Sequence, residues 1–183
     1  MAIDETLPEE LAKNLTPDID LQSLGSQFDL NGKIAFVPGG YGAIGEAVCW
    51  ALAVAGATVA VAGPTGAKAE KLAAMMRSQG YDAQAWALDA RQVSDIQSVV
   101  DEVAEAYGRI DILVNCVGIQ REQTLFEVTE ETFDLMYETN LKSAMFLAQA
   151  VARHQIEQGE GGRHIHLLSV RSQLALRGRG YSA

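Results

Sequence analysis

The chain has 183 residues, of which 48% are hydrophobic and 21% are charged, values that are ordinary for one globular domain. Its net charge of −10 disfavours nucleic acid and anionic membranes as partners, because both require a basic surface that neutralises phosphate groups. The N-terminus has neither the positive nor the apolar region of a signal peptide, and no apolar run reaches the length of a membrane span. Any nucleotide that the protein binds should therefore be a small one.

Cysteines and histidines are the first residues to consider for a metal site. Cys49 and Cys116 lie in apolar segments without a Cys-x-x-Cys spacing, so we expect buried, reduced thiols in a cytoplasmic protein. His164 and His166 would share one face of a strand, but no cysteine or acidic residue lies beside them to complete a ligand set. We therefore expect no bound metal.

Residues 1–29 form an acidic N-terminal arm. Seven acidic residues face a single lysine, Lys13, and Thr6 and Pro8 are suited to begin one short helix. We expect this arm to be solvated and residues 30–183 to form the folded domain.

From residue 30 onwards, short apolar runs alternate with longer helical patterns. This order is typical of repeated βαβ units and predicts an α/β fold, a doubly wound parallel sheet with helices on both faces. The predicted strands span residues 34–37, 58–62, 83–88, 110–115 and 164–169.

Two of the predicted helices show clear apolar periodicity. In residues 93–107 the apolar positions recur at steps of three and four, with Ser94 as the N-cap and Gly108 as the stop. In residues 140–154 the helical period returns, and Phe146 and Leu147 widen the apolar surface. The periodic positions of this second helix are Leu141, Ala144, Met145, Ala148, Val151 and Ala152. A helix that is apolar on more than one face predicts contact with a second subunit, and hence a homo-oligomer.

A glycine-rich segment, PGGYGAIGEAV, follows the first predicted strand. Gly40, Gly42 and Gly45 fit the spacing G-x-G-x-x-G between a buried strand and an amphipathic helix. Unpaired N–H groups and partial positive charge at a helix N-terminus bind a diphosphate, and glycines let the backbone approach it. This context predicts a Rossmann-type dinucleotide site, with a tight strand-to-helix turn that binds no ligand as the alternative.

The same segment resembles the loop Thr-Gly-x-x-x-Gly-x-Gly of the short-chain dehydrogenase/reductase family. Pro38 stands in place of the threonine and Ala43 in place of the middle glycine. The spacing of glycines 39, 42 and 45 also fits the G-x-x-G-x-x-G loop of the family's longer-chain branch. Pro38 has neither an N–H nor a hydroxyl, so other contacts must hold the loop. The resemblance implies that the cofactor is bound at Gly39, Gly42, Ala43, Ile44 and Gly45.

The end of the second predicted strand bears on the choice between NAD and NADP. Dinucleotide folds that prefer NAD place an acidic residue there to bind the ribose hydroxyls, but this chain has Gly63, Pro64 and Thr65. No carboxylate repels a 2′-phosphate and no arginine attracts one, although Thr65 and Lys68 are candidates to bind it. We expect an NAD(P) cofactor, and the sequence slightly favours NADP.

Further positions carry the resemblance. Asp89 matches the family's aspartate beside the adenine, with a loop cap as the alternative. Asn115 and Gly118, in DILVNCVG, match the family's Asn-Asn-Ala-Gly segment, which implies that Asn115 braces the sheet and Gly118 admits the cofactor ribose. Asn140 matches the asparagine that positions a water in the family's proton relay, and it also suits a hydrogen bond to the helix backbone.

The segment GGRHIHLLSVRSQ resembles the family's fifth strand, which ends at the catalytic serine. Ser169 matches this serine, with Ser172 in reserve, and its hydroxyl would donate to the substrate oxygen as charge develops during hydride transfer. The family's proton donor is a tyrosine in Tyr-x-x-x-Lys. Tyr181 is a candidate, and its lysine would be residue 185, beyond the given sequence. Family members often read small-Ser-Ala-Tyr, so Ser182 and Ala183 would instead lead into the catalytic tyrosine. We favour Tyr181 as a neighbour of the catalyst in an N-terminal portion of a longer protein.

The resemblance implies an oxidoreductase that transfers a hydride between a nicotinamide cofactor and an alcohol or carbonyl substrate. GIQR, residues 118–121, resembles sugar-acid members such as gluconate dehydrogenases. Arg121 would pair with a substrate carboxylate, and an ordinary surface arginine is the alternative. A polyol, sugar or sugar acid is the expected substrate, with a 3-oxoacyl or other carbonyl compound next. A noncatalytic dinucleotide-binding or regulatory module is the competing function.

Overall fold

Five parallel strands form the sheet of the computed structural model, which describes residues 28–170 and residue 173. The strands are β1 (Ile34–Pro38), β2 (Thr58–Gly63), β3 (Ala83–Ala87), β4 (Ile112–Asn115) and β5 (Arg163–His166). They lie in the order β3-β2-β1-β4-β5, so the direction in which strands are added reverses between β1 and β4. Most of the predicted acidic arm, together with Ser172 and Tyr181, lies outside the described residues.

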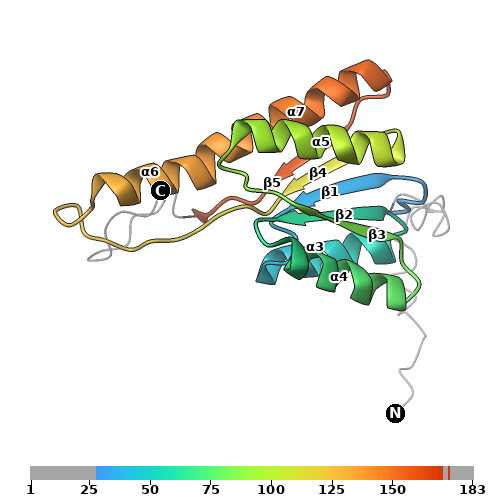
Figure 1. Ribbon diagram of the computed structural model, residues 1–183, viewed down its shortest axis with the longest axis horizontal. Coiled ribbons are helices and arrows are strands. Elements are labelled where there is room, and N and C mark those ends of the chain that lie inside the picture. Colours follow the sequence, from blue (N-terminus) through green and yellow to red (C-terminus); the bar gives the residue numbers. More distant parts are fainter. Residues whose placement is uncertain (1–27, 171–172, 174–183) are drawn as a thin grey trace, which may run out of the picture.

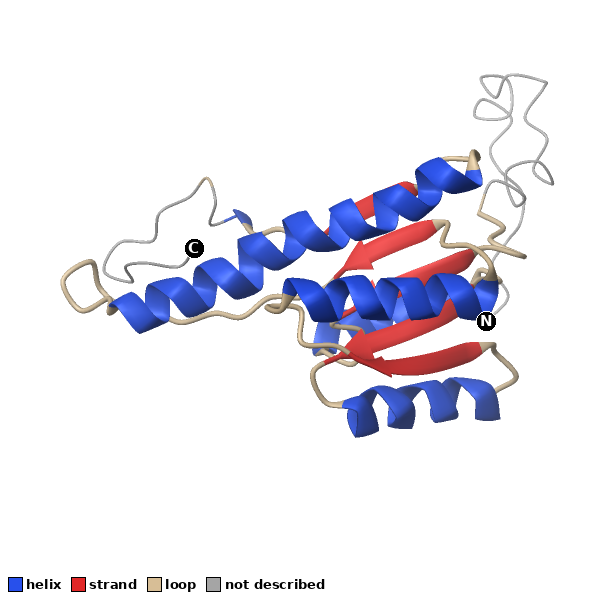
Figure 2. Cartoon of the chain, turned by 45° about the horizontal axis from the view of Figure 1, so that its top comes forward, coloured by secondary structure: helices blue, strands red, loops and turns tan. Residues whose placement is uncertain are grey.

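Helices cover both faces of this sheet (Figures 1 and 2). On one face lie α3 (Ala43–Val54) and α4 (Gly66–Ser78), and on the other lie α5 (Val93–Tyr107) and α7 (Ser143–Gln158). A short helix, α6 (Glu130–Tyr137), continues through the π-helical turn η1 (Glu138–Lys142) into α7. These segments form one long helical rod that projects beyond the sheet (Figure 1). The predicted doubly wound α/β fold is confirmed.

The central strand shows why the first predicted strand reads as a continuous apolar run. Every residue of β1 is buried, since helices cover both faces of the sheet. Ala35 and Val37 pack in the core beneath α3 and α4, while Phe36 packs in the core beneath α5 and α7. The period-two alternation of the strand therefore feeds two apolar cores.

Several predicted element boundaries are wrong. The fifth strand ends at His166, the last residue that pairs with β4, rather than at residue 169. The fourth strand begins at Ile112 instead of residue 110. The N-cap of α5 is Gln92, which has extended dihedrals, so Ser94 lies inside the helix. The predicted stop is confirmed, because Gly108 ends α5 with a left-handed φ of 74°.

The predicted apolar positions of η1 and α7 divide between a buried face and an exposed face. Leu147 and Val151 are fully buried, whereas Leu141 and Met145 are 57% and 60% exposed. The sequence contains two neighbouring apolar stripes in this region, and its periodicity does not tell which of them is buried. Contact with α5 decides between the two, because it buries the stripe that contains Leu147 and leaves the other in solvent.

At the amino-terminal edge of the sheet, Asp111 joins segments that are distant in the sequence. Its carboxylate accepts a hydrogen bond from the Ile34 N–H at 2.9 Å, pairs with the Arg109 guanidinium, and lies 3.6 Å from Lys33 Nζ. Its carbonyl oxygen accepts the N–H of Arg163, which begins β5. Burial raises the pKa of Asp111, but the hydrogen bonds from Arg109 and Ile34 outweigh burial and hold this pKa below its ordinary value.

We expect Asp111→Asn to lower the free energy of unfolding by about 2 kcal/mol at neutral pH, because charged hydrogen bonds at a buried carboxylate are lost. The folded-state pKa is depressed, so this stabilisation is present above the unfolded pKa of about 3.9 and is lost as the pH falls through the folded pKa. Urea denaturation across acidic pH should therefore show the difference between variant and wild type shrinking.

The control for this prediction is Asp134→Asn, at an exposed position of α6. Its unfolding free energy should match that of the wild type within about 0.5 kcal/mol. A cost for Asp111→Asn that stayed constant down to the acid limit would contradict the assigned role of the carboxylate.

Candidate functional site

The predicted cofactor residues gather at one edge of the sheet. Since all five strands are parallel, their carboxyl ends meet at this edge, and ligands of open α/β sheets bind there at the point where strand order reverses. That point lies between β1, which leads into the glycine-rich loop at Gly39, and β4, which ends at Asn115. Thr65, Asp89 and Ser169 follow the other three strands at the same edge.

Two glycines, one in the loop after β1 and one in the first turn of α3, are required by close backbone contacts. Gly39 has a φ of 75°, and a Cβ there would lie 2.6 Å from the carbonyl oxygen of Cys116. A Cβ on Gly45 would overlap the Gly39 carbonyl oxygen. Gly42 has an ordinary φ of −71° at the N-cap of α3, so its conformation does not demand glycine. The loop therefore folds tightly against itself and against the end of β4.

The proline that replaces the family's threonine is accommodated by backbone hydrogen bonds. The N–H groups of Gly39 and Gly40 both donate to the Ala62 carbonyl, at 2.8 and 3.1 Å. The Cys116 N–H donates to the Pro38 carbonyl at 2.9 Å. The loop is thus held to β2 on one side and to β4 on the other without a side-chain hydroxyl at position 38.

The start of α3 has the features that an anion requires. The N-cap Gly42 provides no side-chain cap, so the first N–H groups of the helix, at Ala43 and Ile44, are left for a ligand to bind. Glu46, also in the first turn, is the one acidic group there and opposes an anion. The tight glycine loop and the uncapped helix start together fit a dinucleotide diphosphate.

Beside the end of β2 lies a candidate residue that the sequence patterns did not reveal. Tyr41, in the glycine-rich loop, reaches across to β2, and its hydroxyl accepts the Thr65 N–H at 2.8 Å. A Cβ on Gly63, the last residue of β2, would lie 2.5 Å from Tyr41 Cε1. Motif spacing treats this loop position as variable, so only the contacts of the folded chain draw attention to it. Thr65 is the N-cap of α4, and Lys68 lies exposed in the first turn of that helix.

Asp89, predicted beside the adenine, forms a local ion pair. Arg91 donates from Nε to Oδ1 at 2.9 Å and from Nη2 to Oδ2 at 2.7 Å, and the Arg91 N–H also donates to Oδ1. These hydrogen bonds lower the pKa of Asp89. In the structure, the contacts of Asp89 are therefore those of the alternative, a loop cap. The contact of Asp89 with adenine stays a prediction.

Asn115 joins the ends of β4 and β5. It is 3% exposed, its Oδ1 accepts the Val117 N–H at 3.0 Å, and its Nδ2 lies 3.3 Å from His166 Nδ1. The backbone pairing continues past the strand, because the Leu167 N–H donates to the Asn115 carbonyl. Asn115 therefore contacts both strand ends, and His166 is a partner that the sequence did not indicate.

Asn140 lies in the π-helical turn η1 and is bonded to the segment that follows β4. Its Oδ1 accepts the Ile119 N–H at 2.8 Å, and its Nδ2 donates to the Ile119 carbonyl at 3.0 Å. Gly118, the exposed neighbour of Ile119, lies near the same side chain. A Cβ added at Gly118 would lie 3.6 Å from Asn140 Oδ1, which is an ordinary contact distance. Single π-turns inside α-helices often occur at functional sites, and here the turn brings Asn140 beside Gly118.

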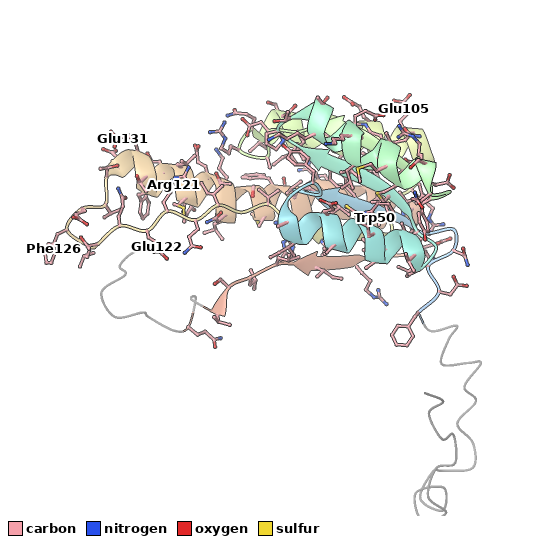
Figure 3. The ribbon with its side chains drawn as sticks, turned by 90° about the horizontal axis from the view of Figure 1, so that it is seen from below. Trp50, Glu105, Arg121, Glu122, Phe126 and Glu131 are labelled. Atoms are coloured by element: carbon pink, nitrogen blue, oxygen red, sulfur yellow. The ribbon has the colours of Figure 1, made fainter. Side chains whose placement is uncertain are left out.

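The remaining predicted residues lie farther out. Ser169 is exposed and follows the end of β5 by three positions. Arg121 is exposed and donates to the Gln120 carbonyl, at 3.2 Å. Figure 3 shows it beside Glu122 on the segment between β4 and α6, away from Trp50 on α3. The structure does not bring Arg121 to the glycine-rich loop, and Tyr181 lies outside the described residues.

The thiols and histidines have structural surroundings. Burial raises the pKa of Cys49 to about 12 and that of Cys116 to about 11, and both are free thiols. Cys49 is buried as predicted, whereas Cys116 is half-buried. His164 and His166 share a face of β5, with ring centroids 6.4 Å apart. Within residues 28–170, no cluster of three or more metal-ligating side chains occurs.

None of the helices in the described ranges combines the length and apolar character needed to cross a membrane.

Known proteins resemble this chain over most of its length. A family model described as short chain dehydrogenase matches residues 33–183. D-threitol dehydrogenase of Mycolicibacterium smegmatis is 34% identical over 157 residues, which cover 85% of this chain and 60% of that protein. The 2-dehydro-3-deoxy-D-gluconate 5-dehydrogenase of Escherichia coli is 33% identical over 162 residues, 86% of this chain and 62% of that protein.

A solved structure gives the same picture. The gluconate 5-dehydrogenase from Burkholderia cenocepacia, in complex with NADP and tartrate, matches with a TM-score of 0.80 and 34% identity, over 84% of this chain and 60% of that chain. This chain thus spans about three fifths of the length of these relatives, with coverages of 60% and 62%. Because the family model matches far more than half of its residues, the chain belongs to the short-chain dehydrogenase family.

Proposed function

We propose that this chain carries the cofactor-binding part of an NAD(P)-dependent oxidoreductase that acts on an alcohol or carbonyl group. The observation that carries this proposal is the tight closure of the loop from Gly39 to Gly45 at the strand-order reversal, in a chain of the short-chain dehydrogenase family. A Cβ at either glycine would push backbone atoms out of the position in which the start of α3 faces the edge.

The chain's own residues would bind and orient the dinucleotide. The backbone at Gly42, Ala43 and Ile44 would bind the diphosphate through the start of α3. Asp89 would meet the adenine, and Gly118 would admit the nicotinamide ribose next to the segment that Asn115 braces. When bound, this cofactor accepts or donates the hydride.

NADP is the preferred cofactor in this proposal. The turn after β2 offers Gly63, Pro64 and Thr65, so no carboxylate repels a 2′-phosphate there. The first turn of α4 has no acidic residue and includes Lys68, which favours an anion. The NADP in the structure of the Burkholderia cenocepacia relative adds support.

Ser169 and Asn140 would serve the chemical step. The Ser169 hydroxyl would donate a hydrogen bond to the substrate oxygen as negative charge develops on it. Asn140, fixed to the Ile119 backbone by two hydrogen bonds, would position a water for proton transfer. Tyr181 would lie next to the proton donor in this proposal.

A polyol, sugar or sugar acid is the proposed substrate. The names of the relatives support this class, because they include D-threitol, galactitol and gluconate dehydrogenases. Arg121, on the segment after β4, would meet a substrate carboxylate only if that segment closes over the edge. Acetoacetyl-CoA reductase of Allochromatium vinosum is 35% identical, which keeps a 3-oxoacyl compound as the second candidate.

The protein is also proposed to form a homo-oligomer. The stripe of α7 and η1 that does not pack on the sheet exposes Leu141 and Met145, and Ile156 on the same stripe is 78% exposed. An exposed apolar stripe of this kind is typical of a surface that packs against a second copy.

The cofactor proposal predicts that the protein binds NADP(H), and that Gly45→Val raises the dissociation constant by at least about 100-fold. The branched side chain would collide with the Gly39 carbonyl and displace the loop. Isothermal titration calorimetry measures the effect, with circular dichroism as the check on folding.

Gly42→Ala is the matched control, because its dihedrals suit alanine and its Cβ, although tight at 3.2 Å from Gly39 O, would displace that atom far less than the overlapping Cβ at position 45. Its dissociation constant should change by less than about tenfold. Tight NADPH binding by a folded Gly45→Val protein would refute the placement of the diphosphate.

In a protein that includes the tyrosine–lysine pair, we expect Ser169→Ala to lower kcat by about 100- to 1000-fold, since a donor to the developing oxyanion is lost. The dissociation constant for NADP(H) should stay within about twofold, because Ser169 lies beyond β5 and outside the diphosphate loop. Steady-state kinetics with a panel of polyols and sugar acids, alongside calorimetry, tests both expectations.

Ser172→Ala is the control for this prediction, since Ser172 is the reserve candidate. A loss of kcat in Ser172→Ala alone would transfer the role to that residue. Wild-type protein that binds NADP(H) but turns over no alcohol or carbonyl compound would instead favour the noncatalytic module.

The oligomer proposal predicts that Leu141→Glu combined with Met145→Glu lowers the molar mass in solution towards that of one chain. Both side chains are exposed, so the charges should not disturb the fold of a subunit but would be buried unpaired between two copies. Light scattering after size-exclusion chromatography measures the mass. An unchanged oligomer in the double variant would place the interface elsewhere.

A further inference from the structure

The contact between Tyr41 and Gly63 joins the glycine-rich loop to the end of β2. Gly63 is buried beneath the half-buried Tyr41 side chain, and a Cβ at position 63 would lie 2.5 Å from Cε1 and 3.0 Å from Cζ of the ring. The ring is tethered at its far end, because its hydroxyl accepts the Thr65 N–H at 2.8 Å. The phenol therefore cannot move aside without breaking a hydrogen bond.

This contact excludes side chains from a position that matters for dinucleotide recognition. In folds that prefer NAD, a carboxylate at the end of the second strand binds the ribose hydroxyls. In this chain that end is Gly63, and the space a carboxylate would occupy is filled by the Tyr41 ring. Glycine at the end of β2 and tyrosine in the loop are thus a matched pair.

We propose that Tyr41 determines the cofactor preference of this site, by filling with an uncharged ring the place from which an acidic side chain would bind the ribose and repel a 2′-phosphate. The inference rests on the proposed binding of NADP, and it adds the residue that makes the phosphorylated ribose acceptable. The hydroxyl of Tyr41 also holds the Thr65 backbone, so the same side chain positions the turn that begins α4.

The contact itself can be tested without a ligand. In the wild-type background, Gly63→Ala should lower the melting temperature, because its Cβ meets the tethered ring. In a Tyr41→Ala background, the same substitution should cost markedly less, since the ring is gone. Equal costs in the two backgrounds would show that the ring does not restrict position 63, and would overturn the inference.

The cofactor preference is tested by calorimetry, which measures the dissociation constants of NADP+ and NAD+. Four proteins are compared. Wild type should favour NADP+, and Tyr41→Phe should keep that preference because it retains the ring. Gly63→Asp alone should weaken both cofactors, since the aspartate and the ring compete for one space. Tyr41→Ala combined with Gly63→Asp should shift the ratio of the two constants towards NAD+ by at least about tenfold.

The outcomes separate this inference from the proposed function. A shift towards NAD+ in Gly63→Asp alone, as large as in the double variant, would overturn the role of Tyr41 while leaving dinucleotide binding intact. An unchanged ratio in a folded double variant would also overturn it. Wild-type protein that binds neither dinucleotide would refute the proposed function itself, and the inference with it.

Discussion

The close approach of the Gly39 backbone to the ends of β2 and β4 is the constraint on which the rest of the site depends. Two N–H groups of the loop share the Ala62 carbonyl, and the Pro38 carbonyl accepts the Cys116 N–H. These hydrogen bonds place the start of α3 at the point where the strand order reverses. A side chain at Gly39 would collide with the backbone after β4, and one at Gly45 would push the start of α3 away from Gly39, so the position of α3 depends on both glycines.

The two edges of the sheet are stabilised by different kinds of interaction. At the amino-terminal edge, the buried Asp111 carboxylate joins the start of β1 to the Arg109 side chain through charge-assisted hydrogen bonds. At the carboxyl-terminal edge, neutral side-chain amides connect the segments instead. Asn115 joins β4 to β5, and Asn140 is hydrogen-bonded to Ile119.

The matched pair of Tyr41 and Gly63 shows how packing restricts the end of β2. A substitution at the end of β2 cannot be judged alone, because the ring above it decides which side chains fit. The same dependence appears on α7, where contact with α5 buries Leu147 and leaves Met145 exposed. In both places a contact with another segment decides the outcome. The Tyr41 ring decides which side chain fits at position 63, and α5 decides which apolar stripe of α7 is buried.

The sequence by itself determined the alternation of strands and helices, the parallel sheet and the glycine-rich turn, because period-two and helical apolar patterns and glycine spacing are local properties. It also indicated Asn115 and Asn140 through family motifs. Only the tertiary structure decided which stripe of α7 is buried, where β5 ends, that Arg91 occupies the Asp89 carboxylate, and that Tyr41 covers Gly63. Each of these depends on contacts between segments that are brought together by folding, and no local pattern encodes such contacts.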